Sequence, residues 1–508
     1  MSKRTVSIFY TIQGSVVDAT LWHKAVLFEM MRCFQASKRY AYRRLLERWS
    51  KRETLSAMQT LFLRNYRYNE AAYERARQTL ASQRELLWIY VNDLEAKIER
   101  SQEKLENLRA GKARPRRTSP ARAIAALERR IEKLARRRDF YQGHLDAGTV
   151  PPIVFGGRKT FRALCRGEIP VELWRELRSN GLYCRGQANQ HGLEGQHGNA
   201  NLELIPLDGN LFKLNVYVPP KDAPVGKGIP RRAEDWLKGL TVWVPDHQVA
   251  RLRDHLRAGR AYSVEIRREG DALKCHITLH LTRVIEVNEA AGMAGVDLNP
   301  SGMAVTIVWP NGNLRASRWF PCPELEYVST GRRDHLIGIL VRDAIRWIKS
   351  FGVNQVAIGR PRFRRTHDTD RRFNRMSHNF IRQKIRETFH SRCYREAMWF
   401  VEVDEAYTSI IGRFKYAKMY GLSVHQAAAL VIARRAMGLR ERVPKALARA
   451  AGIEAGLSHR EAWKRAWAFL EWIRRHAQRH GVWDKTWQLD DYLRYPYRPS
   501  GKALSPQR

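Results

Sequence analysis

The sequence predicts a multidomain α+β protein, in which a β-rich domain with a helical insert precedes an α/β layered domain. Three changes of pattern along its 508 residues predict this fold class. Apolar residues recur every three or four positions from about residue 21 to 141, then every second position from about 150 to 289. From residue 295 onward, strand-like and helix-like segments alternate. The expected divisions are a first strand of the β-rich domain in 1–19, the insert in 20–149, the β-rich domain in 150–289, the α/β domain in 290–437, and a basic, Trp-rich extension in 438–508.

The N-terminal part is expected to begin with a strand at residues 5–12 and to continue as helices. Apolar residues at helical spacing mark two helices, one including Leu87 to Leu108 and the other Ile124 to Leu134. A basic turn with two prolines, residues 111–120, separates them and predicts an antiparallel helical hairpin. A plain coiled-coil arm is the alternative. The Arg and Lys density of the outer face favours contact with a nucleic-acid backbone.

The β-rich domain is expected to form a small barrel-like sheet, because turn residues interrupt its alternating apolar pattern. Asp208-Gly209-Asn210 and Glu269-Gly270-Asp271 each lie between two strand-like runs and predict hairpins. Residues 187–199 are rich in Gly, His and Asn and are typical of a loop, and their histidines lack spaced metal-binding partners.

The α/β domain is predicted from one hairpin followed by alternating strands and helices. Asn311-Gly312 is a strong turn signal between two strand-like runs. An amphipathic helix at 334–351 ends at Gly352, and strands are expected at 355–358 and 400–403. Helices are expected at about 375–395 and around the alanines at 427–429.

The charge of the chain predicts a polyanionic partner. Lys and Arg number 91 against 51 Asp and Glu, which gives a formal net charge of +40. Such a charge opposes compaction unless a polyanion neutralises it, and aromatic residues at 10% provide rings for base stacking. Nucleic acid is therefore the expected partner, and a basic membrane-binding or ribosomal protein is the alternative.

Other features exclude membrane-spanning and secreted classes. No apolar run approaches the roughly 20 residues of a membrane span, and the basic N-terminus lacks the apolar segment of a signal peptide. The six cysteines contain no Cys-x-x-Cys pair, which predicts reduced thiols and no zinc site. We therefore expect a cytoplasmic protein with no membrane partner.

Asp297 is the most informative single residue, because it lies within the apolar run that begins at Gly295. A buried carboxylate is costly unless it is paired or holds a cation. Residues 295–304 resemble the first RuvC motif of TnpB (OrfB) proteins, which are transposon-encoded RNA-guided nucleases related to type V CRISPR effectors. The resemblance covers nearly the whole chain and is densest from 295 to 438. It implies an RNase H-like, RuvC-like domain, a guide RNA and a double-stranded DNA target.

Two of the three acidic positions of this family do not hold carboxylates here. Asp297 matches the first, but Gly359 stands where the family has Glu, and His425 lies near the place of the final Asp. The cysteine-rich zinc ribbon of many members is replaced by residues 410–416. Two-metal hydrolysis needs several carboxylates around the cations. The departures therefore predict a weak or inactive nuclease, with Asp297 as the remaining metal-ligand candidate and no certain cofactor.

Displaced acids could still support activity with Mg²⁺ or Mn²⁺. Asp368 and Asp404 are the principal substitutes, and Asp370, Glu402 and Glu405 lie close to them in sequence. His425 could bind manganese or zinc, although a lone histidine on an Ala-rich helix is more often a packed core residue. Asp297 itself could be a buried polar residue satisfied by Asn299 or by backbone donors.

Basic residues near two glycine-containing segments are the expected nucleic-acid contacts, since guanidinium groups bind phosphates bidentately. One group follows Phe155-Gly156-Gly157, a segment that resembles a glycine-basic element of TnpB-like proteins, and the other follows the strand that ends at Gly359. A tight turn without a ligand and an ordinary solvated face are the alternatives. The residues are Arg158, Lys159, Arg360, Arg362, Arg364, Arg365, Arg372 and Arg375.

The function expected from the sequence is RNA-guided DNA binding by a TnpB-like, transposon-associated protein with a degenerate RuvC-like site. The alternative is an active metal-dependent, RNA-guided DNA endonuclease that uses displaced acidic ligands. A third class is an unguided protein that packages DNA or RNA. The tryptophans of the C-terminal extension are expected either to clamp RNA or to pack onto the α/β domain.

Overall fold

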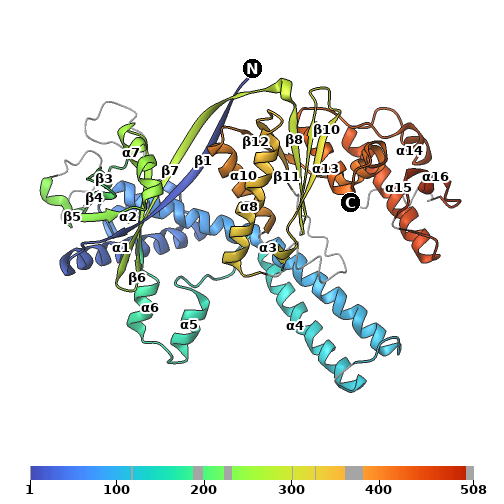
Figure 1. Ribbon diagram of the computed structural model, residues 1–508. Helices are drawn as coiled ribbons and strands as arrows, with labels where there is room; N and C mark the ends of the chain where they lie inside the picture. The colour runs from blue at the N-terminus through green and yellow to red at the C-terminus, as the bar shows by residue number, and fades with distance from the viewer. Residues whose placement is uncertain are drawn as a thin grey trace. The chain divides into compact units, whose positions relative to one another are not determined.

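The computed structural model describes residues 2–115, 118–186, 198–221, 232–299, 301–326, 328–360, 381–484 and 486–498 (Figure 1). The chain forms two compact units. We call Phe9–Leu281 the N-terminal unit, and Met1–Ile8 together with Thr282–Arg508 the C-terminal unit. The finer five-part division expected from the sequence stays a prediction. In the described residues, no helix combines the length and apolar character needed to cross a membrane.

A seven-stranded sheet, in the order β2-β6-β7-β1-β5-β4-β3, organises the N-terminal unit. Both predicted hairpins are present, β3/β4 around Gly209 and β6/β7 around Gly270. Among the described strands the sheet is open, so the expected barrel-like closure is not observed. The edge strand β2 packs against helices α1 and α3 instead of pairing with β3. The strands are β1 (Ser2–Val16), β2 (Gly181–Cys184), β3 (Leu202–Pro206), β4 (Leu211–Tyr217), β5 (Trp236–Trp243), β6 (Tyr262–Glu269) and β7 (Ala272–Val287).

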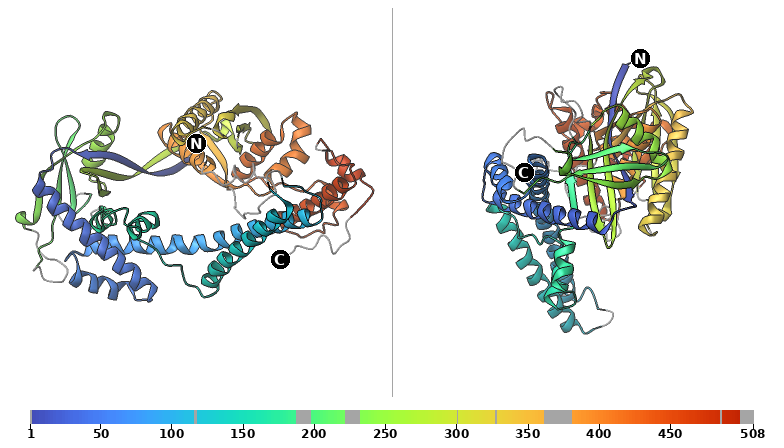
Figure 2. Two further views of the ribbon diagram at one scale, coloured as in Figure 1. Left: turned by 90° about the horizontal axis from the view of Figure 1, so that it is seen from below. Right: turned by 90° about the vertical axis from the view of Figure 1, so that its left-hand side faces the viewer.

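The first four helices of the N-terminal unit begin at side-chain caps that the sequence supplies. Ser50 and Glu53 form a reciprocal capping box at the start of α2, and Asn65 accepts a hydrogen bond from the Tyr68 amide at the start of α3. Helices α3 and α4 form the predicted antiparallel hairpin (Figure 2). The helices are α1 (Leu21–Leu46), α2 (Lys51–Leu61), α3 (Tyr66–Arg109), α4 (Pro120–Asp146), α5 (Arg158–Cys165), α6 (Val171–Leu177) and α7 (Asp246–Arg257).

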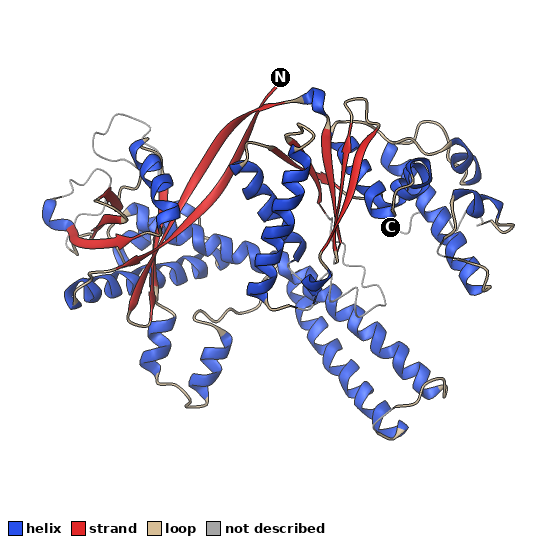
Figure 3. Cartoon of the chain, viewed as in Figure 1, coloured by secondary structure: helices blue, strands red, loops and turns tan. Residues whose placement is uncertain are grey.

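A five-stranded sheet in the order β10-β9-β8-β11-β12 forms the centre of the C-terminal unit (Figure 3). The first three strands are antiparallel, and β11 runs parallel to both β8 and β12. The sequence suggested one strand before the Asn311-Gly312 turn, but the chain already reverses between Asn299 and Gly302 and makes two. The strands are β8 (Met293–Asn299), β9 (Gly302–Val308), β10 (Leu314–Pro321), β11 (Gln355–Arg360) and β12 (Trp399–Asp404).

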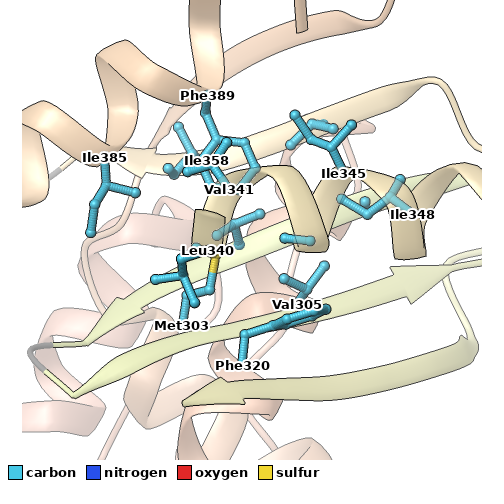
Figure 4. Packing of buried hydrophobic residues seen from close by; sticks show 14 of the residues in the cluster. Met303, Val305, Phe320, Leu340, Val341, Ile345, Ile348, Ile358, Ile385 and Phe389 are labelled. Atoms are coloured by element: carbon cyan, nitrogen blue, oxygen red, sulfur yellow. The ribbon is translucent and has the colours of Figure 1, made fainter. Parts of the chain in front are cut away.

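Helices cover both faces of this sheet. On one face, α8 (Thr330–Lys349) and α10 (Ile381–Arg395) pack over Val296, Val305 and Ile358 to form a buried apolar cluster (Figure 4). On the other face, α13 (Val424–Ala436) packs against β8, β9 and β11. The described residues of the unit also include the helices α11 (Thr408–Ile411), a π-helix (Gly412–Ala417), α12 (Lys418–Tyr420), α14 (Lys445–Ala450), α15 (His459–Arg479) and α16 (Leu489–Arg494).

The tryptophans of the C-terminal extension contribute mainly to the core beneath α13. Trp463 is buried, and Trp472, Trp483 and Trp487 pack against the same cluster of buried residues. Trp467 is the more exposed member of the group, at 37%. Packing onto the sheet layer, one of the two roles expected for this extension, is therefore what the structure shows for most of these rings.

A short distance between α13 and β8 gives a testable requirement for glycine at position 295. A Cβ atom built on Gly295 would lie 2.0 Å from the Ala429 carbonyl oxygen and 2.7 Å from the Ala433 amide nitrogen. Gly295→Ala should therefore push the helix away and destabilise the unit by at least about 1–3 kcal/mol. The control is Gly338→Ala on α8, where a Cβ meets nothing within 4 Å. That change should stabilise by up to about 1 kcal/mol. Thermal unfolding compares the two, and equal effects would contradict the packing described here.

Candidate functional site

Asp297 lies on the face of the sheet that α13 covers, because side chains alternate along β8. Ala294, Val296 and Leu298 enter the cluster under α8, so Gly295, Asp297 and Asn299 face the other way. The Asp297 side chain is 12% exposed. Its Oδ2 atom lies 3.0 Å from Nδ1 of His425, in the first turn of α13. The carboxylate of Asp297 is thus paired with the histidine that was expected near the place of the final acid.

The start of α13 holds His425 in this place. Ser423 caps the helix through a reciprocal capping box with Gln426, which fixes the backbone on either side of His425. Asn299 Nδ2 lies 2.9 Å from His425 Nδ1, and the Trp319 ring is 6.0 Å from the histidine ring. Asn299 therefore contacts the histidine, and His425 lies at hydrogen-bonding distance from the Asp297 carboxylate.

Gly359 is buried on β11, beside Asp297. Ile358 pairs with Val296 across the parallel strands, so the next residues, Gly359 and Asp297, are neighbours on the α13 face. A Cβ atom built on Gly359 would lie 2.7 Å from Oε2 of Glu405 and 3.0 Å from its Cβ. The Glu405 side chain thus occupies the space that a side chain at position 359 would need.

Of the proposed substitute acids, the structure brings Glu405 rather than Asp404 against Gly359. Asp404, at the end of β12, lies opposite Arg360 of β11 in the strand register. Its Oδ1 accepts a hydrogen bond from the Ala406 amide. Glu402 lies on the opposite face, where Arg386 of α10 donates two hydrogen bonds to it. Strand alternation could have selected Glu405, since residues 401 and 403 also face α13. Asp368 falls outside the described residues.

The side chains in this place do not fit a two-magnesium centre. Asp297 is paired with His425, and Gly359 offers no ligand. In the described part of the chain, no group of three or more His, Cys, Asp and Glu side chains is placed to hold a metal ion. The acidic side chains available as ligands are therefore Asp297, which is already paired with His425, and Glu405 nearby.

The expected basic contacts are only partly within the described residues. Arg360 is 71% exposed and lies 3.9 Å from Glu402. Arg158 and Lys159 are exposed at the beginning of α5. Five of the expected contacts lie outside the described residues, namely Arg362, Arg364, Arg365, Arg372 and Arg375.

The two glycines before Arg158 have a local structural role. Both have positive φ angles, 92° for Gly156 and 96° for Gly157, which favour glycine. A Cβ atom on Gly156 would lie 2.7 Å from the Cβ of Arg178. The glycine at 156 therefore lets the chain pass close to Arg178, a residue that sequence reasoning did not single out.

Two cavities were also not predicted. One, of about 410 Å³ in the C-terminal unit, lies beside Glu405 and is lined by aromatic residues that include Tyr407, Phe414 and Trp467. The other, of about 440 Å³ in the N-terminal unit, is lined by five arginines. Each draws residues from segments far apart in the sequence, so no local pattern could have found it.

Comparisons with known proteins give limited matches. A family model described as the SSO2105 N-terminal domain matches residues 9–222, which is less than half of the chain. No curated protein matches the sequence. The chain is similar to one in a structure described as the cryo-EM structure of the Cas12f1-sgRNA-target DNA complex, at 10% identity and a TM-score of 0.22. The similarity covers 84% of this chain and 99% of that one. The family expected from the sequence stays a prediction.

Proposed function

We propose that this protein is a TnpB-like, RNA-guided DNA-binding protein whose RNase H-like domain has little or no nuclease activity. The observation that carries the proposal is the contact of Asp297 with His425, beside Gly359. The strand order β10-β9-β8-β11-β12, with three antiparallel and two parallel strands, supports an RNase H-like domain. Gly359 and His425 both belong to the site that would cut DNA. Loss of carboxylates at these two positions would therefore leave the nucleic-acid-binding surfaces elsewhere intact.

Charge supports the binding half of the proposal. A net charge of +40 favours a polyanion, and base pairing by a bound guide would provide sequence specificity that basic side chains lack. Loss of acidic ligands removes cation binding but not phosphate binding. The domain would then act mainly as a scaffold beside the nucleic acid, and the DNA would be occupied rather than cut.

The first test is to sequence the RNA that copurifies with the protein when it is expressed with its native flanking DNA. We expect a discrete RNA with one constant and one variable end. A DNA that matches the variable end should be bound in preference to a scrambled DNA and should stay uncut with either Mg²⁺ or Mn²⁺. Heterogeneous RNA that moderate salt removes would contradict guided binding and indicate an unguided packaging protein.

The position of Glu405 favours a second candidate, a metal-dependent, RNA-guided DNA endonuclease with a displaced acidic ligand. Its carboxylate replaces the missing side chain at Gly359, on the face that Asp297 shares. Cleavage of the matched DNA by the wild-type complex would favour this candidate. Glu405→Gln should then abolish cutting, as should Asp297→Asn, whereas Glu402→Gln on the opposite face should not.

A further inference from the structure

The cavity of about 440 Å³ in the N-terminal unit is unusual in its charge. Five arginines line it: Arg32 and Arg39 from α1, Arg175 from α6, Arg178 just after α6, and Arg268 from β6. Glu176 is the one carboxylate among the described lining residues, and it lies 3.0 Å from Arg268. We call these five residues the arginine pocket.

The positive charge of the arginine pocket is only partly compensated. Arg32 pairs with Glu29 and Arg268 with Glu176. Within the described ranges, no carboxylate lies at salt-bridge distance from Arg39, Arg175 or Arg178. Burial, and after it the charge of Arg178, lower the pKa of Arg39 to about 10. Like charges that are held together away from water raise the free energy of the empty pocket, and a bound anion would lower it.

Aromatic rings fix the orientation of two of these guanidinium groups. Arg178 lies over the Trp174 ring at 4.2 Å, and Arg268 lies over the Phe28 ring at 4.0 Å. A guanidinium stacked on a ring keeps its in-plane N–H groups available for two parallel hydrogen bonds to oxygen atoms. In the described structure, Arg178 Nε is buried and lacks a hydrogen-bond partner. A buried donor of this kind is costly unless a ligand accepts its hydrogen.

Close packing behind the pocket holds Arg178 in place. The Arg178 carbonyl accepts a hydrogen bond from Nη1 of Arg39 at 3.3 Å, which links α1 to the end of α6. Gly156 packs against the Cβ and backbone of Arg178 from another side. Arg32, by contrast, is 64% exposed, whereas Arg268 is 22% exposed. The pocket thus has three partly buried cations, Arg39, Arg178 and Arg268, and two exposed ones, Arg32 and Arg175.

We propose that the arginine pocket binds consecutive phosphates of an RNA backbone. The size of the pocket allows more than one phosphate group to enter, since 440 Å³ is many times the roughly 30 Å³ that one water molecule occupies in the liquid. This proposal rests on the proposed function for the identity of the polymer, which would be the bound RNA. It adds a defined site, on helices α1 and α6 and strand β6, to an otherwise general basic surface.

The decisive test measures how RNA affinity depends on salt for the full-length protein stripped of its own RNA. The variant Arg39→Gln/Arg178→Gln is compared with wild type and with Arg257→Gln. Arg257 is 77% exposed, pairs with Asp254 and does not line the pocket. With a labelled 20-nucleotide RNA, loss of two phosphate contacts should reduce the slope of log affinity against log salt by about 1.4. Arg257→Gln should leave the slope unchanged.

Binding of inorganic pyrophosphate, compared with the salt slope for RNA, separates an RNA site from a site for free phosphates. It should raise the melting temperature of wild type and Arg257→Gln by several degrees at matched ionic strength, and should not stabilise the double variant. Without an anion, the double variant loses both the repulsion and the Arg39–Arg178 hydrogen bond, so the anion effect on each protein is measured against its own anion-free melting temperature. An unchanged salt slope overturns the proposal, even if pyrophosphate binds. A discrete copurifying RNA would still support the proposed function in that case.

Discussion

Glu441→Gln is expected to lower the free energy of unfolding of the C-terminal unit by about 3–5 kcal/mol, the usual cost of leaving buried charges without their partner. Glu441 is 1% exposed. Its carboxylate accepts hydrogen bonds from Lys415 Nζ and the Tyr416 hydroxyl, each at 2.6 Å, and from Arg434 Nε at 2.5 Å. Its main chain also bonds to α15, since the amide donates to His459 and the carbonyl accepts from Trp463.

The expected loss is large because glutamine keeps the shape of glutamate but leaves two cations without their counter-charge. The Lys415 and Arg434 side chains are only 22% and 16% exposed. For a unit of this size, the loss corresponds to a fall in melting temperature of about 6–20 °C. Glu454→Gln, at an exposed position, is the control and should change stability by less than about 0.5 kcal/mol. Equal melting temperatures for the two variants would show that the contacts of Glu441 with Lys415, Tyr416 and Arg434 contribute nothing to stability.

The same cluster predicts a pH dependence. Burial raises the pKa of Glu441, but hydrogen bonds from Lys415, Tyr416 and Arg434 outweigh it and hold the pKa below its ordinary value. A lowered pKa in the folded state gives stability that is complete above the unfolded value, about 4.3, and is lost as pH falls through the folded value. The difference in the free energy of unfolding between wild type and Glu441→Gln should therefore decrease as the pH falls below about 5. Chemical unfolding at several pH values measures this difference.

If the proposed function is right, carboxylates introduced at positions 359 and 425 are expected to give the protein nuclease activity. The variant Gly359→Glu/Glu405→Gly/His425→Asp would place carboxylates at both changed positions and remove the side chain that now occupies the space at 359. Cation stabilisation of a transition state is worth several kcal/mol, so cleavage of a matched DNA should rise about 10³-fold above background. The measurement is Mg²⁺-dependent cleavage by the complex with its copurified RNA.

Two controls make this result interpretable. Adding Asp297→Asn to the triple variant should return cleavage to background, because the first acid would again be missing. Glu405→Gly alone should stay inactive, which shows that making space is insufficient. If wild type already cuts the matched DNA and loses that activity on Glu405→Gln, the scaffold proposal is wrong and the displaced-ligand nuclease is right.

Local patterns predicted much of the secondary structure. The helical hairpin followed from apolar spacing around Leu87 and Ile124, and the turns at Gly209 and Gly270 followed from residue type. The strand at 355–358 was also placed correctly, as part of β11. The reversal between Asn299 and Gly302 was missed because the apolar runs on either side were interpreted as one strand, although the sequence Asn-Pro-Ser-Gly at 299–302 is itself typical of a turn.

The sequence by itself determined the segments of helix and strand, the large positive charge, and the absence of carboxylates at 359 and 425, since each depends on residue type or short-range spacing. Only the tertiary structure decided which groups meet. His425 reaches Asp297 across 128 residues of chain, Glu405 fills the space at Gly359, and α1, α6 and β6 together build the arginine pocket. Strand register and helix packing choose these neighbours, and electrostatic energy depends on distance in space rather than along the chain.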